Sequence, residues 1–385
     1  MYFGVGKLNM RSHSANNFAP EDLQKVVEIC RKAGVKSYLT LNICLYPEDI
    51  EDAREALLAA KQAGGSAVIA SDMAAILMCR EIGLEVHIST QLSISNAQAL
   101  KFYAQWADVV VLARELNLGQ VKSIYETIVR EQIKGPSGQL VRIEMFAHGA
   151  LCMAISGKCY LSLHAYGASA NRGACYQICR RGYEVTDLET GNKLDIENKY
   201  IMSPKDLCTI EFMDKIIDAG VKVFKIEGRA RSAEYVKRCA QCYRAAADAV
   251  CEGRYTPELA GKLKDSLSEV FNRGFWDGYY QGQTLGEWNS NYGSNATEKK
   301  VYVGRGVKYF SKLGVAEFTC EAAEFSVGDK LLITGPTTGV MYVDVDEIRY
   351  DLNPVQTAQK GQHVSFRVPG KIRPSDKLFK MVVVE

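Results

Sequence analysis

The chain has 385 residues, a formal net charge of +2 and 47% hydrophobic residues, which is typical of a globular protein with about two domains. The near-neutral charge argues against a broadly basic nucleic-acid-binding protein but allows a local basic patch. The N-terminal residues do not resemble a signal peptide, and no stretch reaches the roughly 18 uninterrupted apolar residues of a membrane span, so we expect a cytoplasmic protein without membrane contact.

Strand-like and helix-like runs alternate over the first 250 residues. The strand-like runs lie at 1–5, 36–43, 66–71, 84–90, 108–115, 141–148 and 221–228. The helix-like runs at 20–34 and 47–64 have Pro-Glu-Asp at or near their start and glycine at their end, which suits helix termini. This alternation predicts parallel βα units over residues 1–273, and seven strands with polar carboxyl ends predict a TIM-type (β/α) barrel one unit short. A doubly wound open sheet is the alternative.

The composition changes after the predicted barrel. Residues 274–298 are rich in Gly, Asn and aromatic residues and predict a linker. Residues 299–385 contain short strand-like runs separated by turn residues. They predict a small all-β barrel domain, of a kind that more often binds than catalyses.

Five of the twelve cysteines follow one another in a segment without a regular pattern: Cys152, Cys159, Cys175, Cys179 and Cys208. The other seven lie in helix-like or strand-like runs, where cysteine serves as a small buried hydrophobe. Disulfides are not expected in a reducing compartment. The spacing C-x6-C-x15-C-x3-C-x28-C favours an iron–sulfur cluster, while zinc, a catalytic thiol and unliganded thiols stay open.

The predicted insertion at 148–208 contains these five cysteines and follows the strand at 141–148. That position places the thiols at the carboxyl ends of the strands, where barrels of this type hold their chemistry. Cys208 follows Ser-Pro-Lys-Asp and is expected to begin a helix, whose N-terminus would favour a thiolate. His148 is a candidate general base, and a structural role is the alternative. No HExxH or GxSxG motif is present.

The stretch EMFAHGALCMAISGKCYLS at 144–162 resembles the signature of the collagenase-like peptidase family U-32. The blocks NRGAC at 171–175, SPKDLC at 203–208, KIEGRARSAEYV at 225–236 and FNRGFWDGYY at 271–280 extend the resemblance over essentially the whole chain. Family members begin with one more strand and helix. The resemblance therefore implies that the first βα unit of the barrel is the one missing here.

The resemblance also implies an activity, namely oxygen-independent hydroxylation. It implies a [4Fe–4S] cluster held by Cys152, Cys159, Cys175 and Cys208, with Cys179 as an alternate ligand. Among the family's substrates, the β-domain favours tRNA, with formation of 5-hydroxyuridine at the wobble position and prephenate as the small-molecule hydroxyl donor. A sister U-32 subunit is a possible partner.

Candidate site residues come from the ends of the predicted strands: Glu144, His148, Arg114, Glu227 and Arg229 as catalytic groups, and Arg11, Arg114 and Arg229 as ligands of the donor. Prephenate carries two carboxylates, and a guanidinium meets a carboxylate with two parallel hydrogen bonds. Arg114 and Arg229 lie near the acids Glu115 and Glu227, so structural ion pairs are the alternative for them. Arg11 has no adjacent acid and is the freer candidate.

A basic C-terminal tail is expected to hold RNA phosphates. Its cations are Arg367, Lys371, Arg373, Lys377 and Lys380, against the acids Asp376 and Glu385. Two other functions stay open. One is proteolysis, as the family name suggests, although no protease nucleophile or metal triad is recognisable. The other is a non-catalytic RNA-binding or assembly subunit.

Overall fold

The computed structural model describes residues 1–194, 200–291 and 293–384, which form two compact units. The first unit contains Met1–Ala230, Ala246–Ala260 and Arg273–Ser294, and the second contains Arg231–Ala245, Gly261–Asn272 and Asn295–Glu385. Residues 195–199 of the predicted insertion and Glu385 of the predicted tail lie outside the described residues. Among the described helices, none is both long and apolar enough to span a membrane.

A nine-stranded sheet forms the centre of the first unit. Six strands pair in parallel and in chain order: β1 (Tyr2–Gly4), β2 (Tyr38–Leu41), β3 (Ala67–Ala70), β4 (Val86–Ile88), β5 (Val109–Val111) and β6 (Arg142–Ala150). Strand β10 (Val221–Ile226) lies parallel to β6, while β9 (Asp206–Cys208) pairs antiparallel with the end of β6 and parallel to β11 (Phe275–Trp276). This order confirms the predicted parallel βα architecture.

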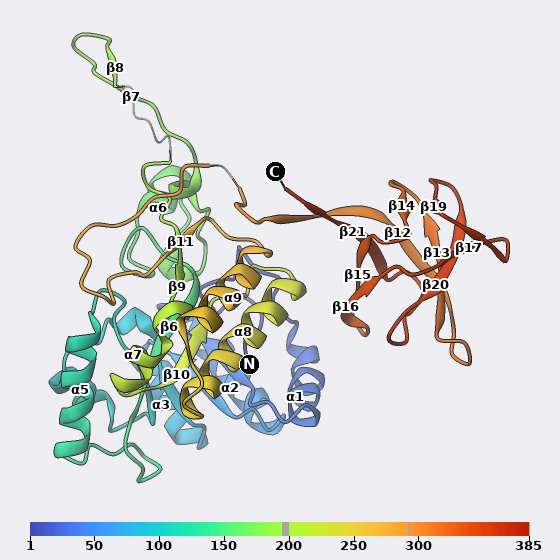
Figure 1. Ribbon diagram of the computed structural model, residues 1–385. Coiled ribbons are helices and arrows are strands. Elements are labelled where there is room, and N and C mark those ends of the chain that lie inside the picture. The colour runs from blue at the N-terminus through green and yellow to red at the C-terminus, as the bar shows by residue number, and fades with distance from the viewer. Residues whose placement is uncertain (195–199, 292, 385) are drawn as a thin grey trace. The chain divides into compact units, whose positions relative to one another are not determined.

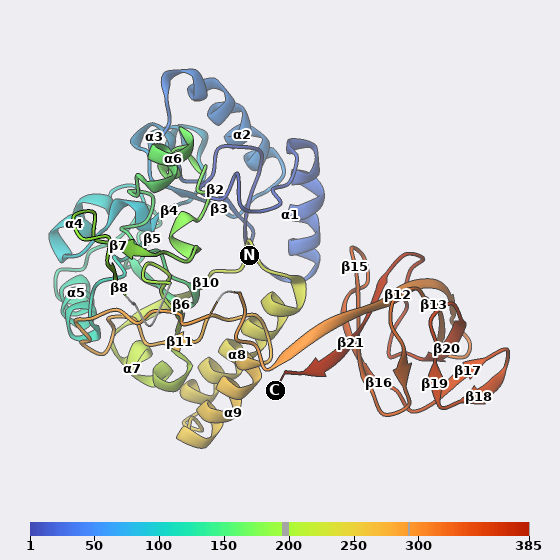
Figure 2. The same ribbon diagram turned by 90° about the horizontal axis from the view of Figure 1, so that it is seen from above.

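Helices cover the outer side of these strands (Figures 1 and 2). They are α1 (Leu23–Lys32), α2 (Ile50–Gln62), α3 (Met73–Ile82), α4 (Ala97–Tyr103), α5 (Leu118–Arg130) and α7 (Met213–Asp218). The remaining elements are α6 (Leu161–Tyr166), β7 (Val185–Thr186), β8 (Lys193–Leu194), α8 (Ala233–Cys251) and α9 (Pro257–Ser268). Val68, Val109 and Val110 are fully buried because parallel strands of this kind are covered on both faces.

The predicted closure of a TIM-type barrel is not found among the described strands. Strand β1 pairs with β2 and strand β10 pairs with β6, so each has an open edge. The two edges are linked by a side chain, since the Tyr2 hydroxyl donates to the Ile226 carbonyl over 3.1 Å. A barrel closes only when backbone groups of its two edge strands pair at about 4.8 Å spacing. The described strand pairings therefore leave this mainly parallel sheet open.

The predicted linker at 274–298 is largely part of the first unit. It contains β11, and the Tyr280 hydroxyl donates to the Phe146 carbonyl over 2.8 Å. Trp276 and Tyr280 are buried, so these two aromatic residues of the segment belong to the core. The predicted boundary at 273 also shifts, because the first part of α8 belongs to the second unit, where Lys300 pairs with Glu234 over 2.6 Å.

The second unit is antiparallel, as predicted. An eight-stranded sheet has the order β16-β15-β21-β12-β13-β20-β17-β18, and β14 pairs with β19. The strands are β12 (Glu298–Phe310), β13 (Val315–Cys320), β14 (Phe325–Ser326), β15 (Lys330–Gly335), β16 (Gly339–Asp344), β17 (Ile348–Tyr350), β18 (Asn353–Val355), β19 (Thr357–Ala358), β20 (His363–Arg367) and β21 (Lys377–Val383). The described pairings form an open path, so the predicted small β-barrel is an antiparallel sheet domain. Within the basic tail, Lys380 already pairs with Asp329 over 2.7 Å.

The packing of the turn between α7 and β10 against α5 can be tested by substitution of its glycine. Gly220 has φ +90°, and a Cβ there would fall on the Tyr125 ring of α5. Gly253 has φ +68° with no atom within 4 Å of a built Cβ. We expect Gly253→Ala to cost about 1 kcal/mol from backbone strain, and Gly220→Ala about 1–3 kcal/mol more from overpacking. Denaturant unfolding of both variants measures the difference, and equal midpoints would contradict this packing.

Candidate functional site

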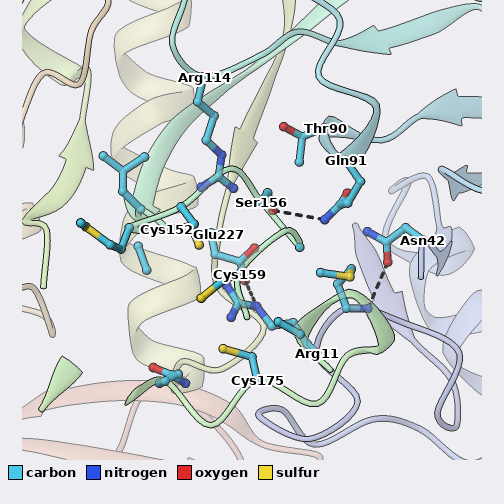
Figure 3. A pocket seen from close by; sticks show the side chains of 18 of the residues that line it. Arg11, Asn42, Thr90, Gln91, Arg114, Cys152, Ser156, Cys159, Cys175 and Glu227 are labelled. Carbon is cyan, nitrogen blue, oxygen red and sulfur yellow. Dashed lines mark hydrogen bonds and ion pairs between the residues drawn. The ribbon is translucent and has the colours of Figure 1, made fainter. Parts of the chain in front are cut away.

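The carboxyl ends of the parallel strands surround a cavity of about 120 Å³ (Figure 3). Its lining includes residues that follow five of the strands: Arg11 after β1, Asn42 after β2, Thr90 and Gln91 after β4, Arg114 after β5, and Glu227 and Arg229 after β10. The rest of the lining comes largely from the segment 150–180. This location agrees with the rule that the loops at this end of the strands carry chemistry.

Four thiols line this cavity, those of Cys152, Cys159, Cys175 and Cys179. Figure 3 shows Cys152, Cys159 and Cys175 in the same part of the cavity as Glu227. Burial raises the pKa of the Cys179 thiol, and negative charge on Cys152, Cys175 or Cys159 raises it further against the effect of Arg180. Thiolates around one cavity repel one another, so nearby positive charge favours their joint ionisation.

Three polar side chains anchor the cysteine segment. Arg180 donates through Nη1 to the Ser203 hydroxyl over 3.0 Å and to the Pro204 carbonyl over 2.8 Å, and through Nη2 to the Leu151 carbonyl. The other two anchors are ties to the strand ends. Arg172 donates to the Cys44 carbonyl over 2.9 Å and pairs with Asp49, and Gln91 donates to the Ser156 hydroxyl over 3.2 Å.

A glycine allows the segment to pass close to the loop after β1. Gly173 has φ +82°, and a Cβ there would overlap the Asn9 carbonyl and the Ser12 side chain. The backbone of His13 donates to the Gly173 carbonyl over 3.2 Å, which holds the two loops together. Only glycine combines this conformation with such a close approach.

Cys208 lies apart from the lining of this cavity. It ends strand β9 opposite His148 of β6 and is buried, so the predicted helix start is wrong at this position. The antiparallel pairing with β6 extends the chain here, and α7 begins only at Met213. Side chains alternate along a strand, and the neighbouring Leu207 lines a second cavity. Cys208 therefore points to the opposite face.

Glu144 and His148 also lie outside the lining of both cavities. Glu144 is buried on β6, where Lys225 of β10 donates to it over 2.6 Å. His148 is buried on the same strand with its ring 5.6 Å from the ring of Phe275. The Lys225 side chain lines the first cavity and is buried, so its charge is shielded from bulk water. Glu144 therefore contacts a residue of the cavity lining but does not line the cavity itself.

Of the three candidate arginines, Arg11, Arg114 and Arg229, Arg11 is the one with a described ion pair to an acid. Its Nε lies 3.7 Å from Glu227, whose other oxygen accepts from the Tyr2 hydroxyl over 3.1 Å. The expectation that Arg11 is the freer cation is therefore wrong, because the fold brings Glu227 to it across 216 positions of the chain. Burial by itself would raise the pKa of Glu227, but Arg11, Arg229 and Arg114 together lower it. Arg229 donates to Asn9 over 3.0 Å and to Thr40 over 3.1 Å.

Arg114 has unused hydrogen-bonding capacity. Its guanidinium lies 3.8 Å from the centroid of the Phe146 ring, and its buried Nε has no hydrogen-bond partner among the described residues. The alternative pairing with Glu115 is not observed in the described part of the chain. Burial lowers the pKa of Arg114. An anion bound at this guanidinium would offset that loss of hydration.

A second cavity of about 240 Å³ adjoins the first. The two share Arg114, Cys152 and Ser156 among their lining residues. Aromatic side chains line the second cavity, namely Trp276, Tyr279, Tyr280 and Trp288. The sequence does not reveal this group, because the Gly- and Asn-rich composition of the segment 274–298 predicts a linker. The signal available was the density of aromatic residues in it.

The donor set fits the chemistry of an iron–sulfur cluster. Thiolates are the ligands of such clusters, and the cations Arg11, Arg114 and Arg180 lie within electrostatic reach of the thiols. No three His, Cys, Asp or Glu side chains among the described residues are close enough to hold a single metal ion. A [4Fe–4S] cluster does not need such closeness, because each of its cysteines binds a different iron.

Comparisons with known proteins agree with the sequence resemblance. Residues 1–290 match Peptidase family U32. The chain is 62% identical over 380 residues to a protein of Porphyromonas gingivalis named collagenase, covering 99% of this chain and 92% of that protein. It is 30% identical over 390 residues to tRNA hydroxylation protein P1 of Bacillus subtilis, covering 99% and 89%. It is 27% identical over 390 residues to tRNA hydroxylation protein P of Escherichia coli, covering 89% and 83%. This chain belongs to the peptidase U32 family.

Proposed function

We propose that the protein is an iron–sulfur-dependent RNA hydroxylase that forms 5-hydroxyuridine at the wobble position of tRNA. The observation that carries the proposal is the gathering of four thiols and several half-buried arginines around one cavity. Relatives along nearly the whole chain are named tRNA hydroxylation proteins, which supports RNA as the substrate. The absence of a histidine among the described lining residues of either cavity fits redox chemistry better than hydrolysis.

The cluster ligands in this proposal are Cys152, Cys159, Cys175 and Cys179. Cys179 takes the fourth position because it lines the same cavity as the other three, whereas Cys208 is buried on β9. When bound, the cluster would supply the electron transfer that hydroxylation without molecular oxygen requires. The chain's own contribution is to shield the site, since Arg180 and Gln91 tie the cysteine segment over the strand ends.

The hydroxyl donor in this proposal is prephenate, and Arg114 binds one of its carboxylates. Five cations line the first cavity, Arg11, Arg114, Arg180, Lys225 and Arg229, against the single carboxylate of Glu227 among the described lining residues. Lys225 is already paired with Glu144, so the excess of positive charge comes from the four arginines, and it suits a dianion. Arg11 is engaged by Glu227. Arg114 and Arg229 each have a buried Nε without a hydrogen-bond partner among the described residues, but Arg229 also donates through Nη1 to two neutral oxygens, so we assign the carboxylate to Arg114.

Proteolysis is a second candidate, because the relative at 62% identity is named collagenase. A cysteine or serine protease needs a base beside its nucleophile, most often histidine. The described lining of both cavities contains cysteines and serines but no histidine. Digestion of gelatin by anaerobically purified protein, lost in Cys152→Ala, would favour this candidate over hydroxylation.

The ligand set is tested by metal content. Protein purified without oxygen should contain about four irons and four labile sulfides per chain. Cys152→Ala and Cys179→Ala should each lose most of the iron, while Cys208→Ala should keep it. Cys251→Ala, which removes an exposed thiol of α8, is the matched control. Loss of iron in Cys208→Ala with retention in Cys179→Ala would overturn the ligand set, and stoichiometric zinc would overturn the cluster.

Donor binding at Arg114 is tested by calorimetry with prephenate on the anaerobically purified protein. Arg114→Lys keeps the charge but loses the planar fork and the stacking on Phe146. We expect its affinity for prephenate to fall about tenfold or more, as for loss of a charge-assisted hydrogen bond. Iron content should stay unchanged. Arg130→Lys, on the exposed face of α5, is the control. Wild-type affinity in Arg114→Lys would remove Arg114 from the donor site.

The reaction itself is tested by mass spectrometry of tRNA nucleosides. A bacterial strain that lacks its own U32 hydroxylation genes should contain no wobble 5-hydroxyuridine. The wild-type gene of this protein should restore the nucleoside, and the Cys159→Ala gene should not. An intact cluster without restored 5-hydroxyuridine would instead favour a non-catalytic subunit.

A further inference from the structure

The outer surface of the cysteine segment carries a row of stacked aromatic rings. The Tyr176 ring lies 4.1 Å from the ring of His13 and 4.9 Å from the ring of Tyr166, with interplanar angles of 37° and 36°. The Arg181 side chain continues the row, since its Nη2 donates to the Tyr166 hydroxyl over 2.7 Å. We call His13, Tyr176, Tyr166 and Arg181 the aromatic row.

The aromatic row and the thiol cavity lie on opposite faces of the same segment. Cys175 and Gln177 line the cavity, but Tyr176 between them does not. Tyr166 and Tyr176 are 49% and 42% exposed, and His13 and Arg181 are also exposed. The Tyr176 backbone is held by a hydrogen bond from its nitrogen to the Ser162 hydroxyl over 3.0 Å. The row is therefore an exposed surface formed in part by residues adjacent in sequence to the site's cysteines.

The charge around the aromatic row is one-sided. Residues 145–183 contain no Asp or Glu, although the whole chain has 45 acids in 385 residues. The same segment contains Lys158, Arg172, Arg180 and Arg181. Exposed rings interleaved with cations, in a segment without carboxylates, match the chemistry of a polyanion that carries flat bases.

The geometry of the row differs from ordinary surface packing of aromatic residues. On α4, the exposed Phe102 packs against Tyr103 and Trp106 with interplanar angles of 87° and 65°. Such edge-to-face contacts satisfy the rings among themselves. The rings of the aromatic row are tilted toward one another and partly exposed, Tyr166 by 49% and Tyr176 by 42%, and stacking on aromatic side chains is the general means of holding unpaired bases.

We propose that the aromatic row binds the unpaired bases of a single-stranded RNA segment, in effect a docking surface beside the thiol cavity. This inference builds on the proposed function, because it identifies the form of RNA that the site accepts. Bases stack on the row while the exposed Arg181 contacts the phosphates; Arg172 and Arg180 are already engaged by Asp49 and by the oxygens of Leu151, Ser203 and Pro204. The target nucleotide is then presented at the cavity on the other face of the same segment.

The binding test uses a fluorescently labelled oligouridine and the full chain purified without oxygen. Tyr166→Ala and Tyr176→Ala should each weaken binding about tenfold, which corresponds to the loss of one stacked base. Tyr176→Phe should bind like the wild type, because the ring and not the hydroxyl makes the stack. Phe102→Ala, which removes an equally exposed ring from α4, should also bind like the wild type.

The ionic part is tested by salt dependence. Affinity of the wild type should fall with salt, and Arg181→Ala should make the slope shallower by about 0.7 for the lost phosphate contact. Circular dichroism checks that each variant is folded. The Arg181 and Tyr166 side chains are exposed, so we expect Arg181→Ala and Tyr166→Ala to fold. If Tyr176→Ala does not fold, these two variants decide the test.

The outcomes separate this inference from the proposed function. Wild-type oligouridine binding in both tyrosine variants overturns the aromatic row as an RNA surface, even if wobble hydroxylation is restored in cells. Weakened binding in those variants supports the row, even if no hydroxylation is found. Two other results also overturn the aromatic row as a surface for single-stranded RNA. One is equal affinity for double-stranded RNA. The other is that the tyrosine variants lose binding of a protein partner but keep binding of RNA.

Discussion

The hydrogen bonds of Arg180 hold the site together. One half-buried guanidinium contacts the Leu151 carbonyl near the start of the cysteine segment and Ser203 and Pro204 after its end. A long segment with little regular structure has few backbone partners of its own, so its position depends on such side-chain ties. Burial lowers the pKa of Arg180, and the accepting oxygens offset the loss of hydration. The cavity, the thiols and the exposed outer face all follow from this placement.

The charges in the cavity explain how so many arginines can share one site. Glu227 accepts the Tyr2 hydroxyl and faces Arg11, while Arg229 is held by Asn9 and Thr40. One carboxylate cannot neutralise all of these cations. The remaining positive field is what four clustered thiols need in order to ionise, and it also attracts an anionic co-substrate. Thiol chemistry and anion binding are thus two uses of one electrostatic arrangement.

The fold was predictable where its cause is local. Alternating strand and helix patterns identified β1 to β6 and β10, because a strand buried on both faces needs a continuous apolar run. The linker prediction failed because glycine and asparagine report turns, whereas the burial of Trp276 and Tyr280 depends on distant residues such as Phe146. Closure of the sheet was also out of reach, since it requires pairing between β1 and β10, strands separated by most of the first unit.

By itself, the sequence determined the parallel βα order, the U32 signature and the set of five candidate cysteines, because these are properties of periodicity and of neighbouring residues. The tertiary structure alone decided that Arg11 meets Glu227 while Arg114 keeps an unpartnered Nε. It also placed Cys179, and not Cys208, on the cavity, and stacked His13 on Tyr176. Each of these relations joins residues from different loops. Their distances depend on how the chain returns across the strand ends, which no local pattern encodes.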